Sequence, residues 1–150
     1  MAFSEQLKKG SFQLMLKTLL QHNVPEKKVF AIANAAQDYT FLDARSKEEF
    51  EVSHIANARY VGYEDFDVHA VKDLATDAPI IVYCSVGYRS EKVAQQLIRA
   101  GYTNTFNLLG GIFEWKNQGQ KVYRGDKETE QVHVYDKVWG VWLLNGEKTY

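Results

Sequence analysis

Residues 79 to 91 read Pro-Ile-Ile-Val-Tyr-Cys-Ser-Val-Gly-Tyr-Arg-Ser-Glu, and this stretch decides the fold. Its continuous apolar run ends at a cysteine and is typical of a strand covered on both faces of a sheet. A helical pattern follows from Ser90 to Ala100, with an acidic residue in its first turn and Gly101 as its stop. A buried strand that leads directly into a helix indicates a βα unit.

The same alternation continues on both sides of this unit. We expect further strands at 39–42, 58–61 and 103–109, and helices after the capping box Ser46-Lys47-Glu48-Glu49, over 64–74 and after Gly110-Gly111. Strands that alternate with helices at this spacing form parallel sheets with right-handed crossovers. The sequence therefore predicts an α/β fold with a central, mainly parallel sheet flanked by helices on both faces.

Three regions differ in their patterns, although the length suits one structural domain. Residues 1–37 form a helical segment that packs on the domain, with a helix over 11–20 and an ambiguous stretch over 26–37. Residues 38–119 form the core. Residues 120–150 form an extension with a hairpin around Gly125-Asp126 and an apolar anchor at 138–144. Trp139 and Trp142 in that anchor pack within the chain or, alternatively, mark a dimer patch.

The composition excludes several classes of protein. Apolar residues make up 45% and charged residues 25%, and 18 basic residues against 19 acidic ones leave a net charge of −1. A chain so balanced, without basic blocks or apolar runs of membrane length, indicates neither a nucleic-acid nor a membrane partner, and we expect a cytoplasmic protein. One cysteine and four histidines without ligand spacing predict no disulfide, no metal and no cofactor.

Cys84 is the candidate nucleophile. It follows a buried strand and precedes a helix start, where unpaired amides carry partial positive charge. Arg89 adds a full positive charge, and Gly87 permits the backbone angles of a tight loop. Such surroundings favour a thiolate that faces an anion, although a lone cysteine is more often a small buried apolar residue.

Four motifs resemble those of the rhodanese family of sulfurtransferases. They are the loop Cys84-Ser85-Val86-Gly87-Tyr88-Arg89-Ser90, the segment Leu42-Asp43-Ala44-Arg45, the pair Glu49-Phe50 with Ser53-His54-Ile55-Ala56-Asn57-Ala58, and Gly110-Gly111-Ile112 with Trp115. They occur in the family's order and cover residues 38 to 119. Ser53 and Asn57 stand where the family usually has glycine.

The resemblance implies a sulfurtransferase that works through a persulfide. Cys84 would take sulfur from a small anionic donor such as thiosulfate and pass it to cyanide or a thiol, including a thiol on a sulfur-carrier protein. The resemblance assigns substrate binding to Ser85, Val86, Gly87, Tyr88, Arg89 and Ser90. Arg89 would attract the donor. Two-domain thiosulfate enzymes of the family carry a second cation where this chain has Lys47-Glu48-Glu49, which weighs against thiosulfate.

Asp43 and Arg45 are the supporting residues. Asp43 either acts at the site, where it orients Arg89 or accepts from loop amides, or has only a structural role within its motif. Arg45 is expected to form a structural ion pair with Glu48 or Glu49. We expect the extension 120–150 to support stability more than turnover.

Three other functions are weighed against sulfur transfer. The first is a rhodanese-like binding module without turnover. The second is a cysteine-dependent phosphatase or arsenate reductase, which would need Cys-x5-Arg, one residue more than the interval from Cys84 to Arg89. The third is a Cys-His hydrolase that uses His54, whose place in the motif instead indicates a structural hydrogen bond.

Overall fold

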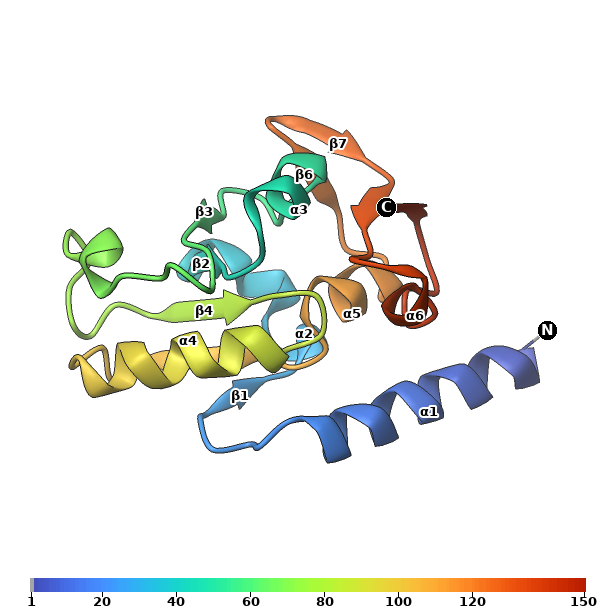
Figure 1. Cartoon of the computed structure of the whole chain (residues 1–150), viewed down its shortest axis with the longest axis horizontal. Helices are drawn as coiled ribbons and strands as arrows, with labels where there is room; N and C mark the ends of the chain where they lie inside the picture. The colour runs from blue at the N-terminus through green and yellow to red at the C-terminus, as the bar shows by residue number, and fades with distance from the viewer. Residues whose placement is uncertain (1) are drawn as a thin grey trace.

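The computed structural model describes residues 2–150, and within them a five-stranded sheet has the order β1-β5-β4-β2-β3 (Figure 1). All neighbouring strands in it run parallel. The strands are β1 Glu26–Lys27, β2 Thr40–Asp43, β3 Arg59–Tyr60, β4 Ile80–Tyr83 and β5 Thr105–Leu108. The central β4 is buried along its whole length. The predicted α/β class is confirmed.

Helices connect the strands and cover the sheet. They are α1 Ala2–Leu19, α2 Val29–Ile32, α3 Lys47–Val52, α4 Tyr88–Arg99, α5 Gly111–Asn117 and α6 Lys137–Gly140, with 3-10 turns η1 Ala33–Asp38 and η2 Val68–Val71. No helix among residues 2–150 is long and apolar enough to cross a bilayer. The capping box of Ser46 and Glu49 at the start of α3 is confirmed.

Alternation along β4 divides the core into two layers. Ile81 and Tyr83 point to one face, where they join a cluster with α1, α2, α5 and the C-terminal extension. Ile80 and Val82 point to the other, where they pack against α4. Because side chains of a strand alternate between faces, one continuous apolar run supplies both layers.

The C-terminal extension packs on the first of these layers. Its hairpin consists of β6 Val122–Arg124 and β7 Lys127–Thr129, and β8 Gln131–His133 pairs in parallel with β9 Glu147–Thr149. Val122, Val132, Val134 and Leu143 are buried in the core. Trp142 stacks on Phe12 of α1 with ring centroids 5.5 Å apart. The predicted hairpin and the predicted packing of the anchor within the chain are confirmed.

Three sequence predictions need correction. The helix expected over 11–20 is the longer α1, which begins at Ala2 and ends at Leu19. The helix expected over 64–74 is only the turn η2, because the Asp67 side chain accepts the His69 amide and so favours a local turn over a continuing helix. The helix expected from Ser90 begins two residues earlier, since Gly87 at φ +122° already serves as its N-terminal cap. The ambiguous stretch over 26–37 contains β1, α2 and η1 in turn.

Candidate active site

The strand β4 delivers Cys84 to the carboxyl edge of the sheet, directly before α4. The Gly87 amide donates a hydrogen bond to Cys84 Sγ at 3.1 Å, and the Ser90 hydroxyl lies 3.3 Å from the same sulfur. The thiol is only 1% exposed, yet it lines an open cleft of about 1050 Å³. The loop thus directs the Gly87 amide at the sulfur, places the Ser90 hydroxyl within reach of it, and puts Cys84 at the wall of the cleft.

Asn107 on β5 competes with Cys84 Sγ for the hydroxyl proton of Ser90. Its Nδ2 donates to the Gly87 carbonyl at 3.1 Å, so its Oδ1 is free to accept from the Ser90 hydroxyl at 2.6 Å. A hydroxyl has one proton. With a neutral thiol, Ser90 donates to Asn107 and accepts from the S–H group, whereas with a thiolate its proton can turn to the sulfur. Nothing in the sequence pattern pointed to Asn107.

The Gly110-Gly111 turn forms the floor of the loop. The amide of Ile112 donates to the Cys84 carbonyl at 2.9 Å, and that of Phe113 donates to the Ser85 carbonyl at 3.1 Å. A Cβ on Gly111, at φ +58°, would lie against the Cys84 carbonyl oxygen and 2.5 Å from that of Ser85. Only glycine at position 111 lets the two backbones come this close. The hydrogen bonds from Ile112 and Phe113 then fix the carbonyls of the loop, while the Gly87 amide faces the sulfur.

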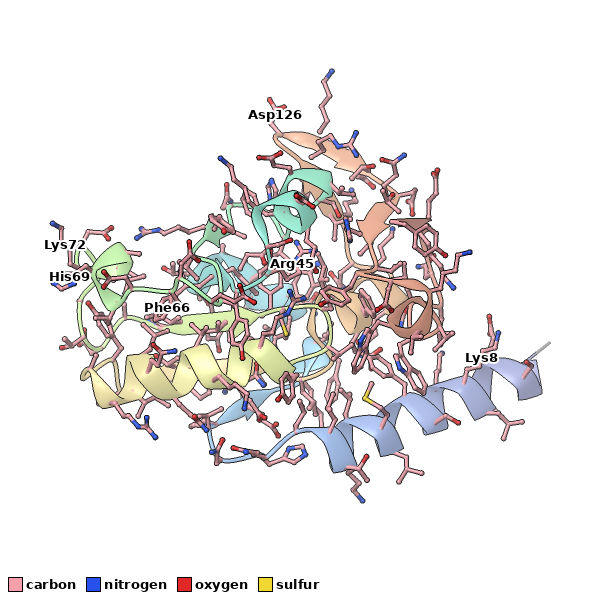
Figure 2. The ribbon with its side chains drawn as sticks, viewed as in Figure 1. Lys8, Arg45, Phe66, His69, Lys72 and Asp126 are labelled. Carbon is pink, nitrogen blue, oxygen red and sulfur yellow. The ribbon has the colours of Figure 1, made fainter. Side chains whose placement is uncertain are left out.

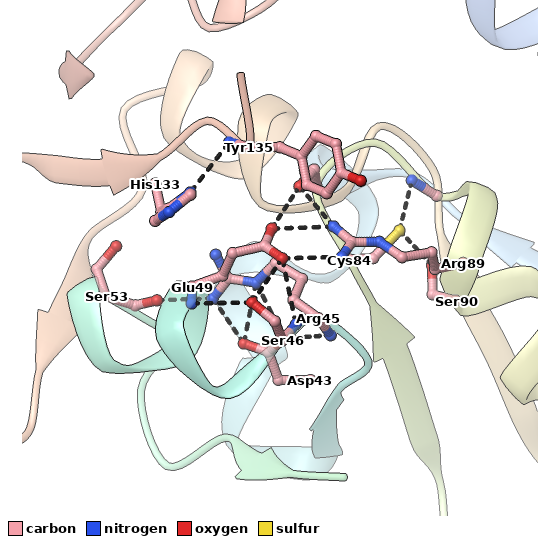
Figure 3. Close-up of polar contacts among 12 residues, drawn as sticks. Asp43, Arg45, Ser46, Glu49, Ser53, Cys84, Arg89, Ser90, His133 and Tyr135 are labelled. Atoms are coloured by element: carbon pink, nitrogen blue, oxygen red, sulfur yellow. Dashed lines mark hydrogen bonds and ion pairs between the residues drawn. The ribbon is translucent and has the colours of Figure 1, made fainter. Parts of the chain in front are cut away.

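Arg89 is paired with Glu49 (Figure 3). Two parallel hydrogen bonds of 2.8 and 2.9 Å join the guanidinium to the carboxylate, and Arg89 also donates to the Ser85 hydroxyl at 3.0 Å. Burial opposes the charge of Glu49, but the hydrogen bonds and charge of Arg89 outweigh it and lower the pKa of Glu49 to about 2. Arg89 therefore does not present the unpaired positive charge that the sequence suggested.

Asp43 and Arg45 pair with each other. The carboxylate of Asp43 accepts from Arg45 Nη2 at 2.6 Å, and both side chains are fully buried (Arg45 is labelled in Figure 2). Arg45 also donates to the Ser53 carbonyl at 2.6 Å, which ties the end of α3 to the end of β2. The expected partners were Arg89 or loop amides for Asp43, and Glu48 or Glu49 for Arg45. The structure contradicts both sets of partners and agrees with the structural alternative for Asp43, because a residue two positions away can make the bidentate contact without crossing to α3.

His54 lies apart from the sulfur. Its ring stacks on Phe50 with centroids 4.5 Å apart, and its Nδ1 lies 2.9 Å from the Ile55 carbonyl. These contacts are those of a structural residue and give no support to a Cys-His hydrolase. Asn57, in the same segment, adopts φ +61°, a conformation that asparagine tolerates better than most residues.

The cleft has walls from all three parts of the chain, and α1 contributes Leu19. The core supplies Val86 and the half-exposed Tyr88 from the loop, with charged side chains from α3. The extension supplies four further lining residues, which are His133, Tyr135, Trp139 and Tyr150. Sequence reasoning missed these four, as it missed the role of Glu49. Residues 2–150 contain no group of three or more His, Cys, Asp or Glu side chains placed to hold a metal ion.

The match to a family model agrees with this geometry. The model of the rhodanese-like domain covers residues 28–118, which include the whole Cys84 loop and the floor beneath it. The chain belongs to the rhodanese-like domain family. The extension that lines the cleft lies outside the matched residues of the rhodanese-like domain.

Two of the curated relatives of this rhodanese-like domain carry different names. The thiosulfate sulfurtransferase GlpE of Coxiella burnetii is 32% identical over 80 residues, which cover 53% of this chain and 74% of that protein. The tRNA uridine(34) hydroxylase of Pectobacterium carotovorum is 35% identical over 88 residues, which cover 55% of this chain but only 25% of that protein. The family is therefore established, while the names of the relatives leave the reaction to be proposed.

Solved structures share the rhodanese-like fold. A rhodanese-related protein from Thermoplasma volcanium superposes with a TM-score of 0.58 at 25% identity, over 67% of this chain and 98% of that one. A thiosulfate sulfurtransferase from Pseudomonas aeruginosa superposes with a TM-score of 0.61 at 23% identity, over 80% of this chain and 23% of that one. The second likeness concerns the fold alone.

Proposed function

We propose that the protein is a sulfurtransferase that carries a sulfane sulfur as a persulfide on Cys84. The observation that supports this most is the surroundings of one sulfur atom, which receives the Gly87 amide and the Ser90 hydroxyl at the end of β4. Such donors stabilise an anionic sulfur, whether it is a thiolate or the outer sulfur of a persulfide. The relation to GlpE supports the same chemistry.

The first half-reaction loads the sulfur. The Cys84 thiolate attacks the outer sulfur of thiosulfate or of another persulfide donor, and a new S–S bond forms. The old bond to that sulfur breaks, and the leaving group, sulfite in the case of thiosulfate, departs with the electron pair. Cys84 then carries an anionic persulfide, and no oxidant or reductant is consumed.

The second half-reaction unloads the sulfur. Cyanide or a thiolate attacks the outer sulfur of the persulfide, the S–S bond to Cys84 breaks, and the Cys84 thiolate is restored. The amide of Gly87 and the start of α4 stay in place through both steps, so the charge on sulfur is stabilised before each one begins.

In this proposal, three charged residues keep the Cys84 loop and its surroundings in place. They are Arg89, Asp43 and Arg45. Glu49 holds the guanidinium of Arg89, which in turn holds the Ser85 hydroxyl beside the nucleophile. Asp43 and Arg45 fix the neighbouring end of β2. Val86 and Tyr88 contribute to substrate binding as walls of the cleft.

Thiosulfate is a weak donor in this proposal. The two arginines of the cleft are paired with carboxylates, whereas Glu48, Glu64 and Asp65 line it with only Lys47 to balance them. A dianion enters such a cleft against its charge. We therefore expect a persulfide donor to load Cys84 faster than thiosulfate at equal concentration.

The experiment that tests the proposal is intact-mass analysis of the chain after incubation with thiosulfate or with an organic persulfide. The wild type is expected to gain one sulfur, about 32 Da, and to form thiocyanate when cyanide is added. Cys84→Ser, which removes the only cysteine, is expected to do neither. A wild type that stays unmodified with every donor would favour the binding module, and a Cys84→Ser variant as active as the wild type would reject the mechanism.

A phosphatase assay tests the remaining alternative. The interval from Cys84 to Arg89 is one residue shorter than phosphatases use, and Arg89 is held by Glu49 instead of facing an oxyanion. Hydrolysis of a phenyl phosphate that depended on Cys84 would overturn the proposal.

A further inference from the structure

The C-terminal extension places Tyr135 at the mouth of the cleft. The guanidinium carbon of Arg89 lies 5.5 Å from the centroid of the Tyr135 ring, and both residues line the cleft of Cys84. Figure 3 shows the ring beside Arg89, on a segment that reaches the loop from the β8 side. Tyr135 lies outside residues 28–118, so the match to the rhodanese-like domain says nothing about it.

Tyr135 occupies a strained turn. Its φ is +75°, and the Asp136 amide donates to the Val134 carbonyl at 2.9 Å, which closes a γ-turn around it. The γ-turn with positive φ is rare and strained, and a side chain with a Cβ adopts it at a cost that glycine avoids. Strained residues of this kind gather at functional sites.

The structure on both sides of Tyr135 enforces the turn. Before it, His133 is paired with Thr149 in the β8–β9 sheet, and His133 Nδ1 accepts the Tyr135 amide at 3.0 Å. After it, the Asp136 side chain accepts the Trp139 amide at 2.9 Å and caps α6. The ring itself stays 57% exposed. Burial of the ring therefore does not explain why a tyrosine is held in this conformation.

The size and lining of the cleft indicate what the ring contacts. About 1050 Å³ is large for cyanide or thiosulfate and is comparable to the largest sites for organic ligands, which reach about 1,000 Å³. Other aromatic lining residues are Tyr60, Tyr63, Tyr88, Trp139 and Tyr150. The carboxylates of Glu48, Glu64 and Asp65 disfavour an anionic substrate.

We propose that Tyr135 is a specificity-determining residue, whose ring contacts the organic body of a thiol acceptor, uncharged or cationic, that takes sulfur from Cys84. The inference rests on the proposed function. In the step it serves, the acceptor thiolate attacks the outer sulfur of the Cys84 persulfide and becomes a persulfide itself. The S–S bond to Cys84 breaks, and its electron pair returns to Cys84 as thiolate.

The test measures the transfer of sulfur from the Cys84 persulfide to the acceptor separately from the loading of Cys84. Wild type, Tyr135→Ala, Tyr135→Phe and Tyr135→Gly are loaded with an organic persulfide, freed of donor, and mixed with an acceptor, while the species heavier by about 32 Da is followed by intact mass. The acceptors are cysteamine, 2-mercaptoethanol, mercaptoacetate and cyanide. Each variant is compared with wild type for the same acceptor, so differences in intrinsic thiol reactivity cancel.

We expect Tyr135→Ala and Tyr135→Gly to slow discharge by cysteamine and 2-mercaptoethanol about three- to tenfold and by cyanide less than about twofold. Tyr135→Phe retains the ring and is expected to stay within about twofold of wild type. Val138→Ala, on an exposed residue of the same extension that does not line the cleft, is the matched control and is expected to match wild type.

Urea unfolding of the variants distinguishes a role of Tyr135 in acceptor preference from a role in stabilising the fold. Because glycine relieves the positive φ, Tyr135→Gly is expected to unfold at a urea concentration no lower than Tyr135→Ala, although both lose acceptor preference. Equal slowing of cyanide and thiols, or unchanged discharge in both variants, would overturn the inference while the sulfurtransferase proposal stands. Failure of wild type to load with any donor would overturn both.

Discussion

Glu49 is one residue that serves two structures at once. Its Oε1 accepts the Ser46 amide in the capping box at the start of α3, and Oε1 and Oε2 each accept one hydrogen bond from Arg89. Its side chain is only 2% exposed. A buried carboxylate stays charged only where partners of this kind surround it, so α3 and the Cys84 loop depend on a single ionised group.

The pH dependence of stability is expected to report this group. The pKa of Glu49 falls from 4.5 to about 2 on folding. Between these values the unfolded chain binds more protons, so the contribution of Glu49, about 3 kcal/mol above pH 5, is lost as the pH falls through about 2. By pH 3 about 2 kcal/mol of it is gone. Urea unfolding of Glu49→Gln between pH 6 and pH 3 is expected to show a loss smaller than that of wild type by about this amount.

Glu48→Gln is the matched control for that measurement. It removes an exposed carboxylate from the same turn of α3 and is expected to follow the wild-type pH dependence. If Glu49→Gln and wild type lost stability in parallel between pH 6 and pH 3, the pairing of Glu49 with Arg89 would not carry this free energy.

Ser90 is expected to tune the reactivity of the thiol. In Ser90→Ala the sulfur keeps the Gly87 amide but loses the hydroxyl at 3.3 Å. Loss of one hydrogen bond to a charged group corresponds to about tenfold, so alkylation by iodoacetamide at pH 7 is expected to slow by about that factor. Gln96→Ala, an exposed change on α4, serves as the control. An unchanged alkylation rate in Ser90→Ala would mean that its hydroxyl stays with Asn107.

Site residues differ in how far local sequence can predict them. Cys84 and Gly87 were predictable, because a buried strand, a tight turn and a helix start are written in consecutive residues. Glu49 was visible as a cap, but its contact with Arg89 depends on β2 and β4 being neighbours in the sheet. Tyr135 had no local signal at all, since its role depends on where the extension packs.

At the scale of elements, α5 determines where the Cys84 loop can lie. Its first amides bind the carbonyls of Cys84 and Ser85, and this contact needs the backbone of Gly111 to come close. The sequence predicted both elements and their order, because their apolar patterns are strong. It could not predict that the amides at the start of α5 would donate hydrogen bonds to the carbonyls of the loop between β4 and α4.

Exchange of two glycines for alanine tests this contact. Gly111→Ala forces a Cβ against two carbonyl oxygens, whereas Gly119→Ala, at φ +83°, has nothing within 4 Å of the new Cβ. Both incur the cost of positive φ, about 1–2 kcal/mol, but only Gly111→Ala adds the clash. We expect its unfolding free energy in urea to be lower than that of Gly119→Ala by at least about 2 kcal/mol. Equal losses would mean that the loop shifts without cost.

At the scale of the whole molecule, the two ends of the chain are joined across the core. Phe12 of α1 stacks on Trp142 of the extension. The side chain of Asn117, at the end of α5, accepts a hydrogen bond from the Leu144 amide and donates one to the Trp142 carbonyl. The extension is thus part of the core cluster on one face of the sheet. Its burial fits the expectation that it supports stability, and four of its residues line the cleft.

A double-mutant cycle measures that link. Phe12→Ala and Trp142→Ala are each expected to destabilise the chain, and the pair to show a coupling of about 1 kcal/mol in urea unfolding. Phe12→Ala with Val138→Ala, an exposed residue of the extension, is the control cycle and is expected to be additive. A coupling near zero for Phe12 and Trp142 would show that the two ends are stabilised independently.

The single, buried cysteine determines how many sulfur atoms the chain can carry and how it can release them. The sulfur is 1% exposed, and these 150 residues contain no second cysteine that could attack a persulfide formed there. The chain therefore cannot discharge its own cargo by closing an internal disulfide. In the sulfurtransferase that we propose, each chain holds one sulfur atom at a time, and that atom waits until a nucleophile arrives from outside.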